Sequence, residues 1–396
     1  MLSSRVLSSC LLALGLGLVH GSSANGYGSN HAPRNATKYV IMDNDWSANG
    51  FIPYLIALDA GWEVLGLTSN TADSWQHQVA LHALATLELG NLTPCIPVIP
   101  GSTWPLINTP ERFQAWEAVH GKLPWEGAFA PYNATAEAAG NDPTSGSDPY
   151  RVVKEAFVEG FPSNASIATL NRGRSASAFM IEMVHRYPGQ VSIYSGGSLT
   201  NVALAVRSDD KFASLAKELI IMGGYIDSNL VQATGSVLQA DLSSDINLMI
   251  DPEAAKIAFT AAFPKITFAG NVANQVMSTQ AFLDEIHEIK NKYSDIVHEY
   301  YGTEFPFWDE TAAAIMVDQS IVTNSSSFYV DVDISYGSPS YGNIHAESIT
   351  KTTSIHIISS WLKNEGNCNT KYKSSHHLIT HPIIIDHLIP SSCMVI

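Results

Sequence analysis

Residues 39–45 read YVIMDND, a run of four apolar residues that passes directly into two aspartates separated by an asparagine. Further short apolar runs follow along the chain, and stretches with helical periodicity separate them. This alternation is typical of βα units around a largely parallel sheet. We therefore expect an α/β fold with an open, mostly parallel (mixed) sheet flanked by helices. The predicted strands are Tyr39 to Met42, Val64 to Thr68, Cys95 to Ile99, Val191 to Tyr194, Leu219 to Met222 and Ile266 to Ala269.

The start of one predicted helix is well marked, because Asp251 supplies an N-cap, Pro252 fits the first turn and Glu253 faces the helix dipole. Residues 100–150 are rich in Pro, Gly, Asn and Trp and show no sustained period. We expect them to form a long ordered excursion that either contacts substrate or is a passive surface loop. The predicted helices are Phe51 to Ala60, Gln76 to Leu89, Ser175 to Arg186, Leu199 to Val206, Ala254 to Phe263 and Phe282 to Lys290.

The N-terminus has the pattern of a secretory signal, with Arg5, an apolar run from Val6 to Val19 and then small residues. That run is shorter than the ~20 apolar residues that a membrane helix needs, so we expect an extracellular protein without a membrane anchor. Five Asn-x-Ser/Thr sequons fit a glycoprotein. They are at Asn35, Asn91, Asn133, Asn164 and Asn324. The expected organisation is a signal peptide over residues 1–24, a polar linker over 25–37, a folded domain over 38–343 and a divergent, poorly ordered tail over 344–396.

Composition excludes some classes of partner. The 396 residues include 21 basic and 37 acidic side chains, and the net charge of -16 would repel a phosphate backbone. We therefore expect no nucleic acid partner, and a small neutral substrate fits better. Removal of the signal would leave Cys95, Cys368 and Cys393, an odd number that implies no disulfide framework.

Polar residues follow the predicted strands at the edge of the sheet where α/β proteins bind ligands. Carboxylates and a hydroxyl brought together there would make an oxygen-rich site suited to a hard cation such as calcium. Each residue alone is equally compatible with a turn or a helix cap. The Asp43 and Asp45 pair also resembles haloacid dehalogenase-type phosphatases, although Trp46 occupies the place where those sites need a compact phosphate cradle. The candidates are the segment from Asp43 to Asn49, and Asp73, Ser195, Asp245, Asn247 and Asp309.

Five segments in this order resemble the nucleoside hydrolase family, and the resemblance extends from Tyr39 to about Ile334. They are YVIMDND (39–45), SGGSLTNVALAVR (195–207), ELIIMGG (218–224), NLMIDPEAAKIAF (247–259) and FWDETAAAIMVDQSI (307–321). The resemblance implies an enzyme that cleaves the N-glycosidic bond of ribonucleosides to free base and ribose at a Ca²⁺ site. The expected partner is a small nucleoside, and assembly as a homodimer or homotetramer is left open.

The resemblance also implies roles for single residues. Asp45 would bind calcium and act as base for the attacking water, with Ser195 and Asp309 as further ligands. Asp245, Asn247 and Asn229 match residues that bind the ribose hydroxyls. Trp308 and Asp73 match purine-specific members, and Trp116 lies near the place of a second stacking Trp. Stacking between indoles would add roughly 1 to 3 kcal/mol per contact and favours purines, whereas ordinary packing is the alternative for either Trp.

The chain departs from the family at two adjacent positions. Where the family carries two aspartates, this sequence has Asn49 and Gly50. Asn49 can still bind a sugar hydroxyl through its amide, but Gly50 cannot be a ligand, and a calcium site with fewer carboxylates binds its ion more weakly. The alternative is thus a catalytically impaired protein of the same fold that binds a nucleoside or ribosyl compound. A phosphatase that requires Asp43 and magnesium is a third hypothesis.

Overall fold

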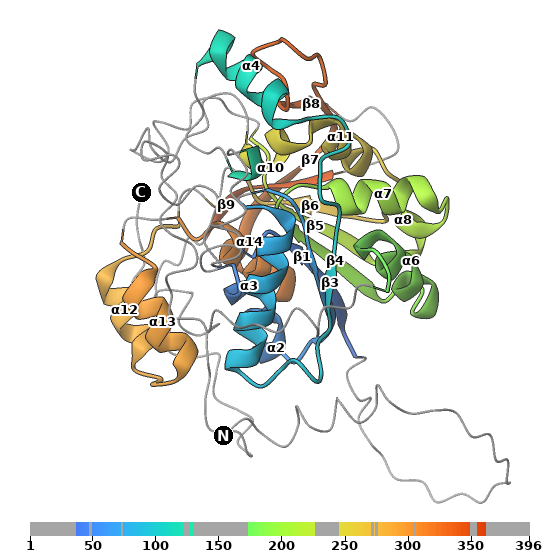
Figure 1. The fold of residues 1–396 in the computed structure, drawn as a ribbon. Coiled ribbons are helices and arrows are strands. Elements are labelled where there is room, and N and C mark those ends of the chain that lie inside the picture. The colour runs from blue at the N-terminus through green and yellow to red at the C-terminus, as the bar shows by residue number, and fades with distance from the viewer. Residues whose placement is uncertain are drawn as a thin grey trace, which may run out of the picture.

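The structure is a computed structural model that describes residues 37–46, 50–72, 74–121, 127–129, 173–225, 245–270, 273, 276–303, 306–348 and 355–361. In this part of the chain, nine strands form one sheet in the order β3-β2-β1-β4-β5-β6-β9-β7-β8 (Figure 1). Neighbours from β3 to β9 pair in parallel, and β7 pairs antiparallel to both β8 and β9. The expected open, mostly parallel mixed sheet is confirmed. The strands are β1 Tyr39–Asn44, β2 Glu63–Ser69, β3 Val98–Pro100, β4 Val191–Gly196, β5 Glu218–Met222, β6 Ile266–Phe268, β7 Val322–Val332, β8 Ile344–Ser348 and β9 Ile355–Trp361.

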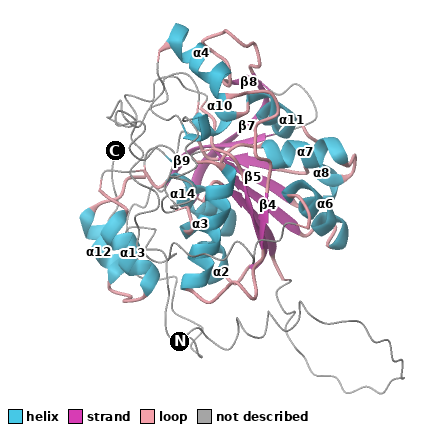
Figure 2. Ribbon diagram, in the orientation of Figure 1, coloured by secondary structure: helices cyan, strands magenta, loops and turns pink. Residues whose placement is uncertain are grey.

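Helices cover both faces of the sheet (Figure 2). The first face packs against α2 (Ile52–Asp59), α3 (Gln76–Leu89) and α14 (Trp308–Val317), and α12 (Gln280–His287) and α13 (Lys292–Tyr300) add residues to the same core. The second packs against α6 (Ala176–Arg186), α7 (Thr200–Ser208), α8 (Phe212–Leu215) and α11 (Pro252–Phe259). The remaining helices are α4 (Pro110–His120), α10 (Ile246–Ile250) and the 3-10 helices Gly127–Phe129 and Gln319–Ile321. Across the described ranges, no helix combines the length and apolar character that crossing a membrane requires.

Alternate residues of one strand supply the cores of the two faces, as the pleat of a β-strand requires. Val40 and Met42 pack in the core beneath α2, α3 and α14, whereas Ile41 packs in the core beneath α6, α7 and α11. The alternation continues to the end of β1. Asn44 therefore points toward the α14 face and Asp43 toward the α7 face.

The predicted elements are present, with a few shifted ends. β3 begins at Val98 instead of Cys95, because the amide of Cys95 donates to the carbonyl of Leu92 at 2.9 Å in a turn. The prediction missed α4 within residues 100–150, although Thr109 caps this helix and a proline follows at once. Cys95 is disulfide-bonded, a bond that the odd cysteine count did not lead us to expect.

The sheet continues past residue 343, where we expected the folded domain to end. Both β8 and β9 lie beyond that residue, and β9 pairs with β6 on one side and β7 on the other. Backbone pairing on both sides, more than its short apolar run, places β9 inside the sheet. The predicted signal peptide, most of the linker and residues 362–396 lie outside the described residues.

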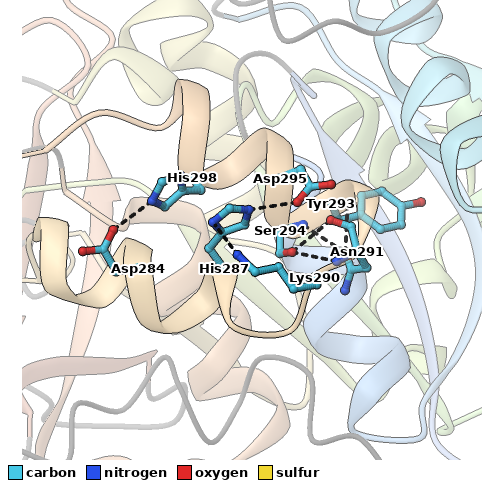
Figure 3. A network of polar contacts seen from close by, with 8 residues as sticks. All are labelled: Asp284, His287, Lys290, Asn291, Tyr293, Ser294, Asp295 and His298. Carbon is cyan, nitrogen blue, oxygen red and sulfur yellow. Dashed lines mark hydrogen bonds and ion pairs between the residues drawn. The ribbon is translucent and has the colours of Figure 1, made fainter.

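A polar network joins α12 to α13 (Figure 3). His298 Nε2 lies 2.8 Å from Asp284 Oδ1, and His287 Nε2 lies 2.9 Å from Asp295 Oδ1. The two imidazole rings stack with their centroids 4.2 Å apart. The two helices thus form one hairpin, which immediately precedes α14 in the chain.

Asp251 joins three segments at the start of α11. Its Oδ2 accepts hydrogen bonds from Thr200 Oγ1 at 2.7 Å and from the amide of Leu106 at 2.8 Å, and its Oδ1 accepts from the amide of Ala254 at 3.0 Å. The predicted cap of α11 is confirmed. The same buried carboxylate thus also satisfies the buried hydroxyl of Thr200 in α7 and an amide of the β3–α4 connection.

We expect Asp251→Ala to lower the free energy of unfolding by about 2 to 4 kcal/mol, because the helix loses its cap and buried donors are left unsatisfied. Ser175, which caps α6 at the surface, is the matched control. Ser175→Ala should cost about 1 kcal/mol. Urea denaturation of both variants measures the difference, and equal losses would contradict the joining role of Asp251.

Candidate active site

The candidate site lies where the strand order reverses, between β1 and β4. The chain proceeds from β1 to β2 and β3 on one side and from β4 to β5 and β6 on the other. The connections after β1 and β4 therefore leave the sheet in opposite directions, and such a point forms the ligand crevice of α/β folds. In register, Asp43 is paired with Ser195 and Asn44 with Gly196, and the amide of Asp45 donates to the Gly196 carbonyl at 3.2 Å.

Asp43 is held by four side-chain donors at the floor of this crevice. Its Oδ1 accepts from Thr68 Oγ1 at 2.6 Å and Asn201 Nδ2 at 2.8 Å. Its Oδ2 accepts from Asn70 Nδ2 at 3.3 Å and Ser195 Oγ at 3.4 Å. Burial raises the pKa of Asp43 to about 6. With both oxygens engaged and no exposed surface, Asp43 organises the strand ends and is poorly placed to attack a phosphate ester.

Asp309, in the first turn of α14, is fixed against the ends of β1 and β4. Asn44 Nδ2 donates to Asp309 Oδ2 at 3.0 Å and to the carbonyl of Gly50 at 3.1 Å. Tyr194 Oη donates to the backbone carbonyl of Asp309 at 3.0 Å. The start of α14 is thus bound to both strands that form the crevice.

The base of the α12–α13 hairpin determines where α14 begins. A β-bridge pairs Met277 with Pro306, and the amide of Phe307 donates to the Val276 carbonyl at 2.7 Å. These contacts join the segment before α12 to the segment after α13. The chain therefore returns to the sheet immediately before Asp309.

Acidic groups gather around the hydroxyl of Tyr194. Burial raises the pKa of Tyr194 well above its usual value, and the charges of Asp309, Glu310 and Asp45 raise it further. Burial, then the charge of Asp309, raises the pKa of Glu310 to about 8, and Tyr301 Oη donates to Glu310 Oε1 at 3.0 Å. The charges of Asp45 and Asp309 thus act on the same tyrosine of β4.

Two amide oxygens in the crevice are buried without a hydrogen-bond partner among the described residues. They are Asn44 Oδ1 and Asn70 Oδ1. Both face glycines of the turn after β4. A β-carbon at Gly196 would overlap Asn44 Oδ1 and lie 2.9 Å from Asp309 Oδ1, and a β-carbon at Gly197 would overlap Asn70 Oδ1. Only glycine leaves room for these side chains.

These oxygens allow a test of the calcium ion that the resemblance implies. Within the ranges that the structure describes, no group of three or more His, Cys, Asp or Glu side chains is arranged to hold a metal ion. The crevice nevertheless collects carboxylate, amide and backbone carbonyl oxygens, which are the ligands calcium prefers. An unsatisfied buried amide oxygen gains much from a cation. In chemical type, the carboxylates of Asp45 and Asp309 and the neutral amide and carbonyl oxygens match the ligands that calcium prefers.

Asp245 and Asn247 lie at the carboxyl end of β5, on the same edge of the sheet. Asp245 caps α10 and accepts a hydrogen bond from the amide of Asn247 at 2.9 Å. Asn247 Nδ2 donates to the carbonyl of Met222, the last residue of β5, at 3.3 Å. Both predicted ribose-binding residues are thus locally fixed by the strand end and the helix start.

The two predicted stacking residues meet one apolar cluster above the sheet edge. Its buried members are Ala72, Phe113, Trp116, Phe129, Ile246, Met249, Ile250 and Tyr341, and Trp308 packs against it. Trp116 is buried, and its Nε1 donates to the Ser338 carbonyl at 2.8 Å. α4 therefore brings Trp116 to the segment that follows Asp245.

Three predicted site residues, Asn49, Asp73 and Asn229, lie outside the described residues. Two others were not anticipated: Asn70 and Asn201. Asn44 lies within the candidate segment from Asp43 to Asn49, but no role of its own was predicted for it. The roles of Asn70 and Asn201 depend on contacts with Asp43 that no local pattern encodes.

Residues 40–372 match the family described as inosine-uridine preferring nucleoside hydrolase. The chain belongs to the nucleoside hydrolase family. As expected from the sequence, it is a ribonucleoside N-glycosyl hydrolase by class.

Relatives of this nucleoside hydrolase include proteins of fungi, plants and bacteria. The chain is 35% identical to an uncharacterized protein of Schizosaccharomyces pombe over 78% of its own length and 76% of the relative's. It is 29% identical to uridine nucleosidase 1 of Arabidopsis thaliana over 70% of its length and 69% of the relative's. In fold it is similar to the purine-preferring ribonucleoside hydrolase of Gardnerella vaginalis, with a TM-score of 0.61, 18% identity and coverage of 82% of this chain and 94% of the other.

Proposed function

We propose that this nucleoside hydrolase is a secreted, calcium-dependent enzyme that releases free base and ribose from purine ribonucleosides. The observation that supports the proposal is the hydrogen bond from Asn44, the residue before Asp45, to Asp309, which lies 265 positions farther along the chain. A bound calcium ion would acidify an attacking water and bind the ribose diol. Asp45 and Asp309 would hold it, with the carbonyl of Ser195.

The chain's own residues supply the remaining chemistry. Asp45 accepts the proton of the attacking water as a general base. Asp245 and Asn247, fixed at the end of β5, bind ribose hydroxyls and hold the anomeric carbon at attacking distance. The neighbouring carboxylates stabilise the positive charge that develops on the sugar as the bond to the base breaks.

Preference for purines is supported by the aromatic cluster beside the crevice. Trp308 opens α14 next to Asp309, remains partly exposed and packs against the cluster that contains Trp116. An indole face adds roughly 1 to 3 kcal/mol per stacked base, and a purine offers the larger ring system. Trp308 is the better candidate of the two, because the Trp116 ring lies against His120 with centroids 4.7 Å apart.

Secretion is supported by the signal pattern at the N-terminus and by the sequons. Among the sequons, Asn91 follows α3 and is exposed, as glycan attachment requires. A glycosidase sensitivity assay on protein recovered from culture medium tests both properties. The enzyme should appear in the medium and lose apparent mass on removal of N-linked glycans.

A panel of nucleosides tests the activity. We expect kcat/KM for inosine and guanosine to exceed that for uridine about tenfold or more, which corresponds to one additional stacking contact. Stripping calcium with a chelator should abolish base release, and added calcium should restore it.

Other outcomes separate the alternatives. Saturable nucleoside binding without base release, at saturating calcium, would favour the non-catalytic binding protein. Phosphate release from phosphoesters with magnesium would favour the phosphatase. Higher kcat/KM for uridine would contradict the purine preference alone.

A further inference from the structure

The geometry points to Asn44 as the residue that replaces, in part, the carboxylate missing at Gly50. We infer that its amide nitrogen positions Asp309 and that its amide oxygen is a neutral ligand for the divalent cation. This inference deepens the proposed function and rests on it.

The first part follows from the two hydrogen bonds of the Asn44 amide nitrogen. One goes to Asp309 Oδ2 at 3.0 Å and the other to the carbonyl of Gly50 at 3.1 Å. A single buried amide group therefore links the strand end, the connection after β1 and the start of α14. A hydrogen bond from a neutral donor orients the Asp309 carboxylate without cancelling its charge. Asp309 can therefore still bind a cation.

The second part follows from the other end of the same amide group. Asn44 Oδ1 is buried and has no hydrogen-bond partner in the part of the chain that is described. It faces Gly196, and Asp309 Oδ1 faces the same point from α14, 2.9 Å from where a β-carbon would be. Both oxygens thus pack close to Gly196, and a larger residue at that position would displace them. An unsatisfied buried acceptor normally has an explanation, and a bound cation is one of them.

Asp43, the neighbouring carboxylate, cannot be the ligand that compensates for Gly50. Its side chain points to the α7 face, where its two oxygens already accept four hydrogen bonds. Asn44 points to the face on which Asp309 lies. The exchange of a charged ligand for a neutral one predicts a cation site that is weaker and more dependent on the exact place of Asp309.

Calcium binding to the chelator-stripped protein, measured by isothermal titration calorimetry without nucleoside, tests the inference. We expect Asn44→Leu, similar in size and without polar atoms, to weaken calcium binding about 10- to 100-fold. Asn108→Leu is the matched control, because the buried Asn108 amide donates to two carbonyls, of Met249 and Ile250. It should lower the melting temperature without changing calcium affinity.

A second variant covers the case in which Asn44→Leu does not fold. Asn44→Asp adds charge but replaces the hydrogen bond to Asp309 with repulsion between carboxylates. It should lower the melting temperature of the calcium-free protein and increase the rise on adding calcium. Unchanged calcium affinity in Asn44→Leu, or a smaller calcium-dependent rise in Asn44→Asp, would overturn the inference. Failure of the unaltered protein to bind calcium would overturn both this inference and the calcium dependence of the proposed function, whereas normal binding with no effect of the Asn44 substitutions would overturn this inference alone.

Discussion

Replacing Asp45 by alanine is expected to lower kcat for inosine by about 10²- to 10⁴-fold, the range that a lost general base produces. The variant loses both the acceptor for the proton of the attacking water and a ligand of the cation. Because both contributions act most strongly in the transition state, kcat should fall far more than KM rises. Steady-state kinetics at saturating calcium measures the two parameters separately.

The control for this variant is Asp209→Ala. Asp209 follows α7 at the end opposite Thr200, and its Oδ2 lies 2.8 Å from His185 Nε2. Its removal should leave kcat unchanged. A turnover by Asp45→Ala within a factor of a few of the unaltered enzyme would remove Asp45 from the mechanism.

The second large effect is expected from Gly196→Ala. A β-carbon there would overlap Asn44 Oδ1 and lie 2.9 Å from both Asp309 Oδ1 and Tyr194 Oη. Relief of this overlap must displace Asn44 or the start of α14. Since a misplacement on the order of 1 Å costs about 10²-fold in rate, we expect a loss of that size in kcat/KM.

Gly66→Ala provides a matched comparison for Gly196→Ala. This glycine lies in β2, and a β-carbon there would be 2.8 Å from the ring of Phe179 on the α6 face. The substitution should lower the melting temperature and leave kcat/KM near that of the unaltered enzyme. If both variants lose stability alike and keep their activity, the crowding around Gly196 has no part in catalysis.

Local patterns were sufficient for much of the fold. The period of the apolar residues placed α3 at Gln76–Leu89, and the Asp-Pro-Glu sequence placed the start of α11 at Pro252. Both signals lie within a single element, so they need no knowledge of its partners. The prediction missed α4 because the helix lies in a stretch dominated by Pro, Gly and Asn, where the capping Thr109 was the main signal.

The sheet beyond residue 343 shows the opposite case. β9 is held between β6 and β7 by backbone hydrogen bonds to segments distant in the sequence. Propensity and periodicity describe a segment, not its neighbours, so this stretch looked like a divergent tail. Its place in the sheet is a property of the assembled strands.

For the site, too, some features could be predicted from local sequence and others depended on the assembled fold. The order of motifs in the sequence was enough to assign the chain to an α/β enzyme of ribonucleosides and to single out Asp45, Asp309 and Asn247, because those residue types occur at recognisable points after strands and before helices. Only the tertiary structure decided which face each side chain takes and what it meets there. In the structure, Asp43 accepts four hydrogen bonds at the floor of the crevice. Asn44 donates a hydrogen bond to Asp309. The physical reason is the pleat of β1, which sends adjacent residues to opposite faces, so that a carboxylate and an amide one position apart meet entirely different partners.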